Sequence, residues 1–324
     1  MTNTTHRGTI DPEILDMLRS SIRHVLTEAS DSSLADRLAE LGWEEVLADD
    51  APTALRTLFE IKGETLSVAD ALGPSLARAL ADLTGDESLA GATFTLPSPY
   101  GPTVIEGDAI HVDAVALSPL STERVICAVD GRLVICSPAG LTSAQLGGTD
   151  DTLGLVRLTG TVAASDATWV NAAAWDRLVA HGRWLLACEL VGIGRHVIAS
   201  AVEYTKERVQ YGKPIGVFQA LQHRLASAHS MVVGAGHLIV EAGNAGDEWT
   251  AMVAKCMAGQ AAENACTQAQ QCYGAIGFTW EHEFHRYLRR TYVLDRMLGD
   301  WRSLEHEIGT RLQETGVVPH IGNL

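Results

Sequence analysis

Apolar residues recur at helical spacing throughout the C-terminal half of the chain. One series shares a single helical face and comprises Val179, Leu186, Leu190, Ile193, Val197, Ala201 and Tyr204. A second series has the same spacing and comprises Phe218, Leu221, Leu225, Ala228, Val232, Ala235 and Ile239. Steps of three, four or seven residues return to one face of an α-helix. A third, alanine-rich helix is expected from Asp247 or Glu248 to Tyr273, and a fourth over 281–298. The short connections predict an antiparallel four-helix bundle from residue 169 onward, followed by an amphipathic turn or helix over 301–314.

The central part of the chain has the period of strands. Short β-branched runs bounded by Gly, Pro and Asp occupy 103–105, 110–117, 125–129, 133–136 and 153–162. Asp130 and Gly131 stand between two of these runs and predict a hairpin, because both residues tolerate positive φ.

The N-terminal part of the chain is helical in pattern. Residues 11–48 predict two helices, with Asp11 and Pro12 as the N-cap and first position, and with Ser32 or Ser33 as a second cap. Helical patterns over 53–60 and 67–83 follow. The fold class is therefore mainly α with a central small β domain, and we expect domains at 1–88, 89–166 and 167–324.

Two motifs in the bundle carry candidate chemistry. The first connects the first two bundle helices, where Gly212 and Pro214 are expected to end a helix near Tyr211 and Gln219 opens the next. Arg208 beside this turn can hold a phosphate bidentately, although an arginine that only caps the helix C-terminus has the same position. The second motif follows the third helix and contains a glycine, Gly274, whose missing Cβ allows close approach to the backbone.

Both motifs resemble those of the acyl-CoA dehydrogenase family. The run ERVQYGKPIGVFQ is similar to the family pattern ER-x-[TQ]-FG-x-x-[IL]-x-x-x-Q, and QCYGAIGF is similar to Q-x-x-GG-x-GF, with Ala275 in place of the second glycine. Leu41-Gly42-Trp43 also resembles the family's LGW. The resemblance implies a shortened N-terminal helical domain, a shortened β-barrel-like domain and a C-terminal four-helix bundle. It further implies FAD as cofactor, bound at its pyrophosphate and adenosine, partly across a subunit boundary, by Arg208, Gln210, Tyr211, Gln219, Gln271, Gly274 and Ala275.

The chain departs from the family at the positions that perform the reaction. The family abstracts a proton with a glutamate, but its two base positions are occupied here by Leu298 and Gly182, and neither side chain can accept a proton. We therefore expect no catalytic residue in this chain. Three acids remain as outside candidates for a relocated base: Glu189, Glu281 and Asp300. Helix capping is the more ordinary role for Glu281.

The segment that holds the flavin ring in the family is also reduced. Residues 94–101 replace it, with Thr95 and Ser98 as the remaining hydroxyls. We expect the β domain to be a structural remnant. Arg289 and Arg290 are expected to form a solvated or interface pair, and the family's LMRD element makes structural ion pairing an alternative.

The composition and charge of the chain argue against several classes of function. The chain has 40 acidic and 24 basic residues and a formal charge of −16, which argues against nucleic-acid binding. No run approaches the roughly 18 apolar residues of a membrane span, and the first eleven residues have no signal-peptide core, so we expect a cytoplasmic protein without a membrane association. The six cysteines contain no C-x-x-C pair and are expected to be buried free thiols. His282 and His285 have helical spacing but no evident third ligand, so no metal site is expected.

These expectations combine into a hypothesis of divided labour. The chain would be the non-catalytic subunit of an α2β2 acyl-CoA dehydrogenase, similar to the shortened subunits found in bacterial degradation of steroid side chains. A fuller-length partner, encoded by a neighbouring gene, would supply the glutamate, the ring contacts and most of the acyl-CoA site. Two alternatives stay open: a self-sufficient homotetramer with a relocated base, and a flavin-free scaffold or interaction protein.

Overall fold

The computed structural model of the 324-residue chain describes residues 10–28, 34–117, 120 and 123–319. The chain divides into two compact units. We call residues 1–69 with 184–324 the helical unit, and residues 70–183 the β unit. The long helix α5 begins in the β unit and continues in the helical unit.

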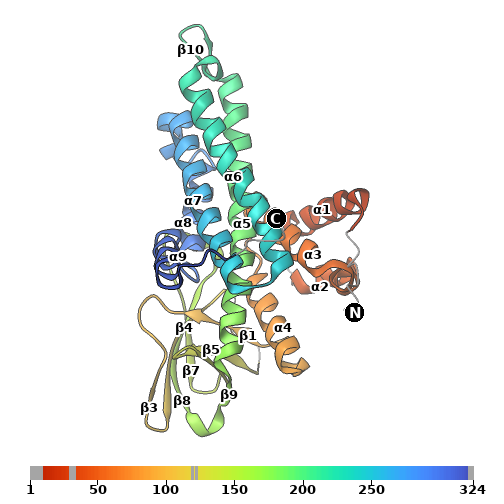
Figure 1. The fold of residues 1–324 in the computed structure, drawn as a ribbon, viewed down its shortest axis with the longest axis vertical. Coiled ribbons are helices and arrows are strands. Elements are labelled where there is room, and N and C mark those ends of the chain that lie inside the picture. Colours follow the sequence, from red (N-terminus) through yellow and green to blue (C-terminus); the bar gives the residue numbers. More distant parts are fainter. Residues whose placement is uncertain (1–9, 29–33, 118–119, 121–122, 320–324) are drawn as a thin grey trace. The chain divides into compact units, whose positions relative to one another are not determined.

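Four long helices form the bundle that the sequence predicts (Figure 1). They are α5 (Ala172–Glu207), α6 (Gln219–Ala245), α7 (Glu248–Tyr273) and α8 (Phe284–Arg296), and α9 (Trp301–Thr315) follows. Asp247 caps α7 by accepting a hydrogen bond from the Thr250 amide, and α6 begins at Gln219 as expected. The first helix begins at Ala172 and not at Trp169, because Trp169 belongs to strand β9.

Three N-terminal helices complete the helical unit. They are α1 (Pro12–Thr27), α2 (Leu34–Glu40) and α3 (Trp43–Thr65). The Asp11 side chain accepts a bond from the Glu13 amide, which confirms the predicted cap, whereas Ser32 and Ser33 lie outside the described residues. The predicted helix over 53–60 is the second part of α3, which bends at Asp50 just before Pro52.

The described part of the β unit contains helix α4 (Leu72–Thr84), the first part of α5 and two small sheets. The helix expected over 67–83 corresponds to α4, which begins five residues later than expected, at Leu72. The sheet orders are β1-β5-β6-β9 and β2-β4-β8-β7, with β3 on the outer side of β4. The strands are β1 (Thr93–Phe94), β2 (Leu96–Pro97), β3 (Val104–Glu106), β4 (Ala109–Ala116), β5 (Val125–Val129), β6 (Arg132–Cys136), β7 (Leu141–Gln145), β8 (Val156–Ala163) and β9 (Thr168–Val170).

The inward-facing residues of both sheets form one apolar core. Strands β4 and β8 supply Val112 and Leu158, and β5 and β6 supply Cys127 and Val134. The predicted hairpin between β5 and β6 is confirmed, since Asp130 and Gly131 have φ of 47° and 70°.

The six cysteines are all buried free thiols, as expected. We expected no segment with the length and hydropathy of a membrane span, and for α5 this expectation was wrong. Among the described residues, α5 is long enough and contains an 18-residue window of mean hydropathy 1.6. In the structure 72% of that window is buried, and the core helix of a soluble protein passes the same test.

Candidate functional site

The first motif forms a short hairpin rather than the end of a helix. Helix α5 ends at Glu207, and strands β10 (Val209–Gln210) and β11 (Lys213–Pro214) pair antiparallel. Tyr211 and Gly212 form the turn with φ of 53° and 76°, so the prediction that the helix continues to Tyr211 was wrong. A turn with positive φ at both central residues matches the twist of a two-residue hairpin, and glycine adopts it without strain. The hairpin carries Gln210 on β10 and projects Tyr211 at its tip.

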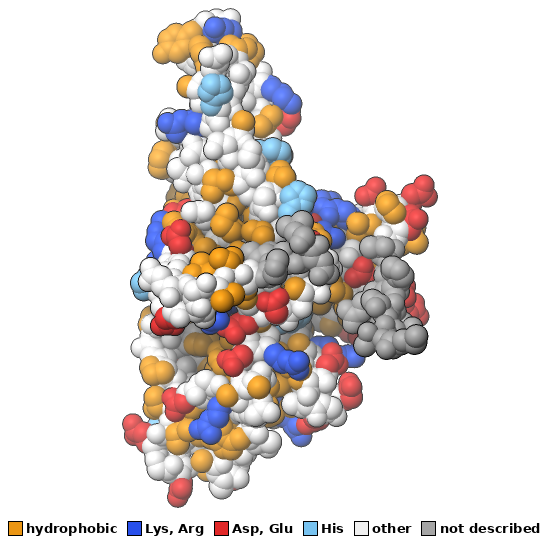
Figure 2. Space-filling model, in the orientation of Figure 1, with side chains coloured by type: hydrophobic (Ala, Val, Ile, Leu, Met, Phe, Trp, Pro, Cys, Tyr) orange, Lys and Arg blue, Asp and Glu red, His pale blue; other side chains and the backbone are white. Residues whose placement is uncertain are grey.

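The Arg208 side chain is exposed at the base of this hairpin. Its backbone is fixed, because the Arg208 amide donates to the Tyr204 carbonyl over 2.9 Å and the Arg208 carbonyl accepts from the Ile215 amide over 2.8 Å. No acid within the described ranges forms an ion pair with its guanidinium. Tyr211 is 92% exposed, and Figure 2 shows hydrophobic and basic side chains together at this end of the bundle. The hairpin therefore presents a cation and an aromatic ring to solvent.

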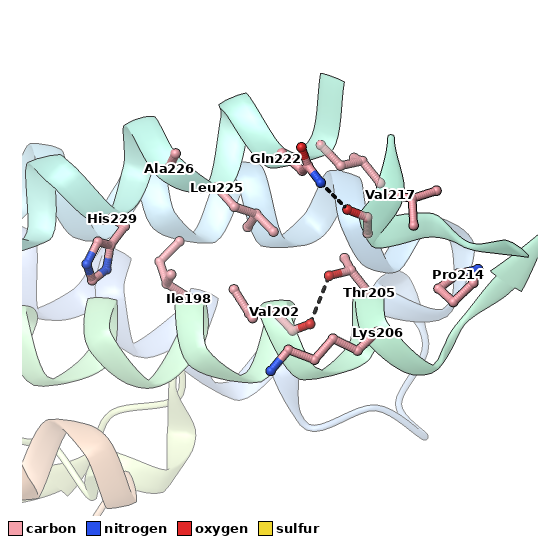
Figure 3. A pocket seen from close by; sticks show the side chains of 12 residues that line it. Ile198, Val202, Thr205, Lys206, Pro214, Val217, Gln222, Leu225, Ala226 and His229 are labelled. Carbon is pink, nitrogen blue, oxygen red and sulfur yellow. Dashed lines mark hydrogen bonds between the residues drawn. The ribbon is translucent and has the colours of Figure 1, made fainter. Parts of the chain in front are cut away.

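An apolar groove of about 680 Å³ lies beside the same hairpin, between α5 and α6 (Figure 3). Ile198, Val202 and Leu225 point into it from the two helices. The Gln222 amide donates to the Gly216 carbonyl over 2.8 Å and closes one end. None of Arg208, Tyr211 and Gln219 lines this groove, so the exposed polar residues of the motif lie outside it.

The second motif lies at the C-terminal end of α7. Gly274 follows the helix with φ of 62°, and a Cβ built there meets no atom within 4 Å. A cavity of about 470 Å³ opens beside it. The lining includes three predicted residues and several that the sequence did not indicate: Gln271, Gly274, Ala275, Cys266, Thr267, Gln270, Phe278, Leu288 and Tyr292. Burial raises the pKa of Cys266 to about 12, so this cavity contains no ionised thiol at neutral pH.

Both motifs lie at the same end of the bundle (Figure 1). The antiparallel course of the helices brings the end of α5, the start of α6 and the end of α7 together. The Arg224 guanidinium of α6 donates to the Gln268 amide oxygen of α7 over 3.0 Å and links the two helices there. The structure thus assembles two groups of predicted residues at one end, with Arg208, Gln210, Tyr211 and Gln219 in one group and Gln271, Gly274 and Ala275 in the other.

Glu189 is held in a buried charge cluster. Its carboxylate accepts from Lys62 Nζ over 2.7 Å and lies 3.6 Å from Arg290 Nη1. All three side chains are at most 2% exposed, and Arg290 also donates to the Ser67 carbonyl over 3.1 Å. The carboxylate is committed to two buried cations, so it is held inside the protein and not directed at a substrate. The cluster also corrects the prediction of a solvated arginine pair, since Arg290 forms the structural ion pair that was the alternative.

The other two acids have ordinary positions. Asp300 caps α9, where its carboxylate accepts from the Ser303 amide over 3.2 Å and from the Ser303 hydroxyl over 2.9 Å. Partial burial acts to raise the pKa of Asp300, but these hydrogen bonds lower it overall. Glu281 is exposed and does not begin a helix, because α8 begins at Phe284 and the His282 ring accepts from the Phe284 amide. The predicted capping role of Glu281 was therefore wrong, and His282 fills that role.

Residues 94–101, which stand in place of the family's flavin-ring-binding segment, form hydrogen bonds within the β unit. The Thr95 hydroxyl is buried and donates to the Ile126 carbonyl over 2.8 Å. Ser98 accepts from the Tyr100 amide over 3.1 Å. Thr95 thus supports its own sheet instead of facing a ligand.

Comparison with known proteins identifies the bundle. The model described as "Acyl-CoA dehydrogenase, C-terminal domain" matches residues 173–306. Residues 173–306 are thus similar to the C-terminal domain of acyl-CoA dehydrogenases. Acyl-CoA dehydrogenase IpdE2 of Mycobacterium tuberculosis is 34% identical over 131 residues, which are 40% of this chain and 41% of that protein. Acyl-CoA dehydrogenase FadE34 of the same organism is 30% identical over 207 residues, which are 61% of this chain and 29% of that protein. The chain thus matches less than half the length of these curated relatives.

Solved acyl-CoA dehydrogenase structures share the fold over nearly the whole chain. The Tcur3481-Tcur3483 steroid ACAD G363A variant has a TM-score of 0.77 at 22% identity and covers 94% of this chain and 99% of its own. The ChsE4-ChsE5 complex from Mycobacterium tuberculosis has a TM-score of 0.73 at 18% identity, and the likeness covers 98% of this chain and 100% of that one. These likenesses confirm the predicted acyl-CoA dehydrogenase fold, including the small sheet region.

Proposed function

We propose that this chain is the non-catalytic subunit of a heteromeric acyl-CoA dehydrogenase and contributes adenosine and pyrophosphate contacts to FAD. A fuller-length partner chain would supply the flavin-ring contacts, the glutamate base and most of the acyl-CoA site. The observation that carries the proposal is the exposed Arg208 guanidinium, which has no acidic partner in the described part of the chain and stands on a well-fixed backbone.

The exposed residues fit the adenosine-diphosphate half of FAD. The Arg208 fork suits a phosphate, and Gln210 and Gln219 are exposed amides close to it in the chain. The cavity at Gln271, Gly274 and Ala275 is large enough for an adenosine-sized group. When bound, FAD accepts the hydride of the desaturation. The residues of this chain would bind and orient the cofactor at its far end.

The proposal assigns proton abstraction to the partner chain. Glu189 is neutralised by Lys62 and Arg290, and Asp300 serves as a helix cap. Leu298 and Gly182, at the positions where the family has its base, have no ionisable group. With this arrangement the chain would hold the cofactor and leave proton abstraction to the partner chain.

The likeness to structures of two-chain assemblies supports a heteromeric arrangement, for which we propose α2β2. The steroid ACAD among them supports a steroid side-chain thioester of CoA as the substrate. Both the heterotetramer and the substrate are part of the proposal, as is a cytoplasmic location.

Purification of the chain alone and together with the dehydrogenase encoded by the neighbouring gene tests the proposal. We expect the lone chain to be colourless and inactive, and the co-expressed pair to contain FAD and to reduce a dye in the presence of acyl-CoA. An FAD-containing lone chain that turns over would show the self-sufficient enzyme instead. A colourless lone chain that captures no partner would show the scaffold.

Replacing Arg208 in the co-expressed pair tests the proposed contact between Arg208 and the FAD pyrophosphate. Arg208→Ala should weaken FAD binding about tenfold to a hundredfold, because a charge-assisted hydrogen bond contributes roughly 1.5–3 kcal/mol. Lys206→Ala is the matched control, since Lys206 is an exposed cation two residues earlier that pairs with Glu203 over 2.6 Å. Flavin titration by fluorescence measures both variants. Equal FAD affinity in the two variants would contradict the assignment of Arg208.

A further inference from the structure

The apolar groove between α5 and α6 has stiff walls and a closed end. Ile198 and Val202 lie one turn apart on α5, and Leu225 faces them from α6 (Figure 3). Isoleucine and valine are stiff at χ1, so the α5 wall adapts little. At the hairpin end, Gly216 lies so close to α5 that a Cβ on it would be 3.0 Å from the Thr205 carbonyl oxygen. The groove is therefore formed before any ligand binds.

The groove is short and has polar side chains at its edges. Its lining on α5 extends from Ile198 to Lys206, which is about 12 Å at about 1.5 Å per residue. Lys206, Gln222 and His229 are exposed. A stable protein–protein interface buries roughly 1,200–2,000 Å², more than a groove of two helical turns offers. A small molecule suits it better, because its volume of about 680 Å³ is typical of ligand sites.

The charges of the lining favour an uncharged ligand. In the described part of the chain no acidic residue lines the groove, although the chain has 40 acidic residues. The lysine of the lining, Lys206, is paired with Glu203 over 2.6 Å. The groove thus has no acid to hold a cation, and its ammonium group already has a carboxylate partner. A neutral apolar molecule fits this lining better than a fatty-acid anion does.

Thr205 gives the groove a hydrogen-bond acceptor. Its hydroxyl donates to the Val202 carbonyl over 2.8 Å, so the hydrogen is committed and the lone pairs of Oγ1 can still accept. Figure 3 shows this oxygen between the two helices, at the hairpin end of the groove. A ligand that bonds to it must donate a hydrogen, as an alcohol does.

We infer that the groove binds an uncharged fused-ring alcohol of the sterol class, with its hydroxyl at Thr205. A rigid ring system loses less conformational entropy between preformed walls than a flexible chain does. The site is separate from the family's base position at Gly182, because Ile198 lies about four helical turns further along α5. The inference does not rest on the FAD contacts proposed for Arg208, which does not line the groove.

Calorimetric titration of the full chain with four probes tests the ligand class. Pregnenolone is a fused-ring alcohol and progesterone a related ketone, while dodecanol and dodecanoate are flexible chains without and with a charge. We expect pregnenolone to bind with a dissociation constant of about 10 µM, and the other three at least about fivefold more weakly. A flexible chain that binds as tightly as pregnenolone would overturn the fused-ring class. Absence of pregnenolone binding would overturn the site.

A phenylalanine placed in the groove tests its location. Ala226 is an exposed residue of the lining, and Ala226→Phe should weaken pregnenolone binding at least about tenfold, because the ring occupies the groove. Ala220→Phe is the matched control, since Ala220 is an exposed alanine of α6 that does not line the groove. Its affinity should stay within about twofold of the unmodified chain. Equal affinities in the two variants would show that pregnenolone binds elsewhere.

Thr205→Val tests the position of the hydroxyl. The substitution removes the acceptor with little change of shape, so pregnenolone should bind about threefold to tenfold more weakly while progesterone binding stays unchanged. Equal losses for both probes, or none for either, would overturn the hydrogen bond at Thr205. Circular dichroism confirms the folding of each variant. If Ala226→Phe does not fold, the difference between the two probes in Thr205→Val still locates the ligand.

Discussion

Glu189 has a carboxylate, the functional group that a catalytic base needs, but its surroundings are those of a structural ion pair. Its carboxylate lies between Lys62 and Arg290, on a helix that also carries the exposed ion pair of Glu203 and Lys206. Exposed pairs contribute little to stability, whereas breaking a buried pair leaves an uncompensated charge. Glu189 and Glu203, both on α5, therefore allow a direct comparison.

Glu189→Gln should lower the free energy of unfolding by about 3 kcal/mol or more, because Lys62 and Arg290 would remain buried with excess positive charge. Glu203→Gln should change it by less than about 1 kcal/mol. Chemical denaturation of both variants measures the difference. A Glu189→Gln chain that keeps its stability while the co-expressed complex loses turnover would instead identify Glu189 as a relocated base.

Residues whose partners are near in sequence were predictable. Asp11, Asp247 and the Asp130-Gly131 turn bond or bend within a few positions, and the structure confirms each. The partner of Glu189 lies 127 residues away at Lys62, and Arg290 bonds Ser67 across 223 residues. Pattern reasoning within one segment contains no information on such distances, so the buried cluster was missed.

At the scale of elements, α3 and α5 cross with their backbones in close approach. A Cβ at Gly63 would lie 2.0 Å from the Glu189 carbonyl oxygen, and one at Gly192 would lie 2.0 Å from the Glu60 carbonyl oxygen. The two glycines thus let the helix backbones touch from both sides. The contact places Lys62 of α3 against Glu189 of α5, so the crossing and the charge cluster depend on each other.

Gly192→Ala should destabilise the chain by about 2 kcal/mol, because the new methyl group collides with backbone that cannot rotate away. Gly234→Ala on α6 is the control, where a Cβ meets nothing within 4 Å and alanine should stabilise the helix by up to about 1 kcal/mol. Urea unfolding midpoints with unchanged slopes would show that both effects act on stability. Two variants of equal stability would contradict the close crossing.

Helices and strands with a strong periodicity of apolar residues were predicted from the sequence, and those with a weak periodicity were not. Helices α6 and α7 and strands β4, β5 and β6 lie close to their expected ranges, and α8 and β8 were predicted as elements although each begins three residues later than expected. Strand β7 was missed because its residues are mostly exposed and give no alternation of apolar and polar positions. The end of α5 was misplaced because the glycine and proline signals also suit a hairpin, and only the backbone shows Tyr211 in the turn.

At the scale of the whole molecule, the stability should depend on pH through two half-buried histidines whose pKa is lowered in the folded chain. Burial lowers the pKa of His181 in α5 to about 4 from an ordinary 6.5, and burial also lowers the pKa of His196. A histidine with a lowered pKa in the folded chain takes up its proton more readily in the unfolded chain. Stability is therefore full above about pH 6.5 and falls as the pH decreases toward 4, where the folded His181 also becomes charged.

The contribution of His181 to this loss should be at most about 3 kcal/mol, since one pKa unit corresponds to about 1.4 kcal/mol. His181→Gln removes the titrating group, so the free energy of unfolding should decrease less steeply between pH 6.5 and 4 than in the unmodified chain. His237→Gln replaces an exposed histidine of α6 and serves as the matched control for the substitution itself. Urea titrations at four pH values in this range measure the slopes. If His181→Gln and the unmodified chain lose stability in parallel, the acid sensitivity arises elsewhere, and His196→Gln becomes the next variant to measure.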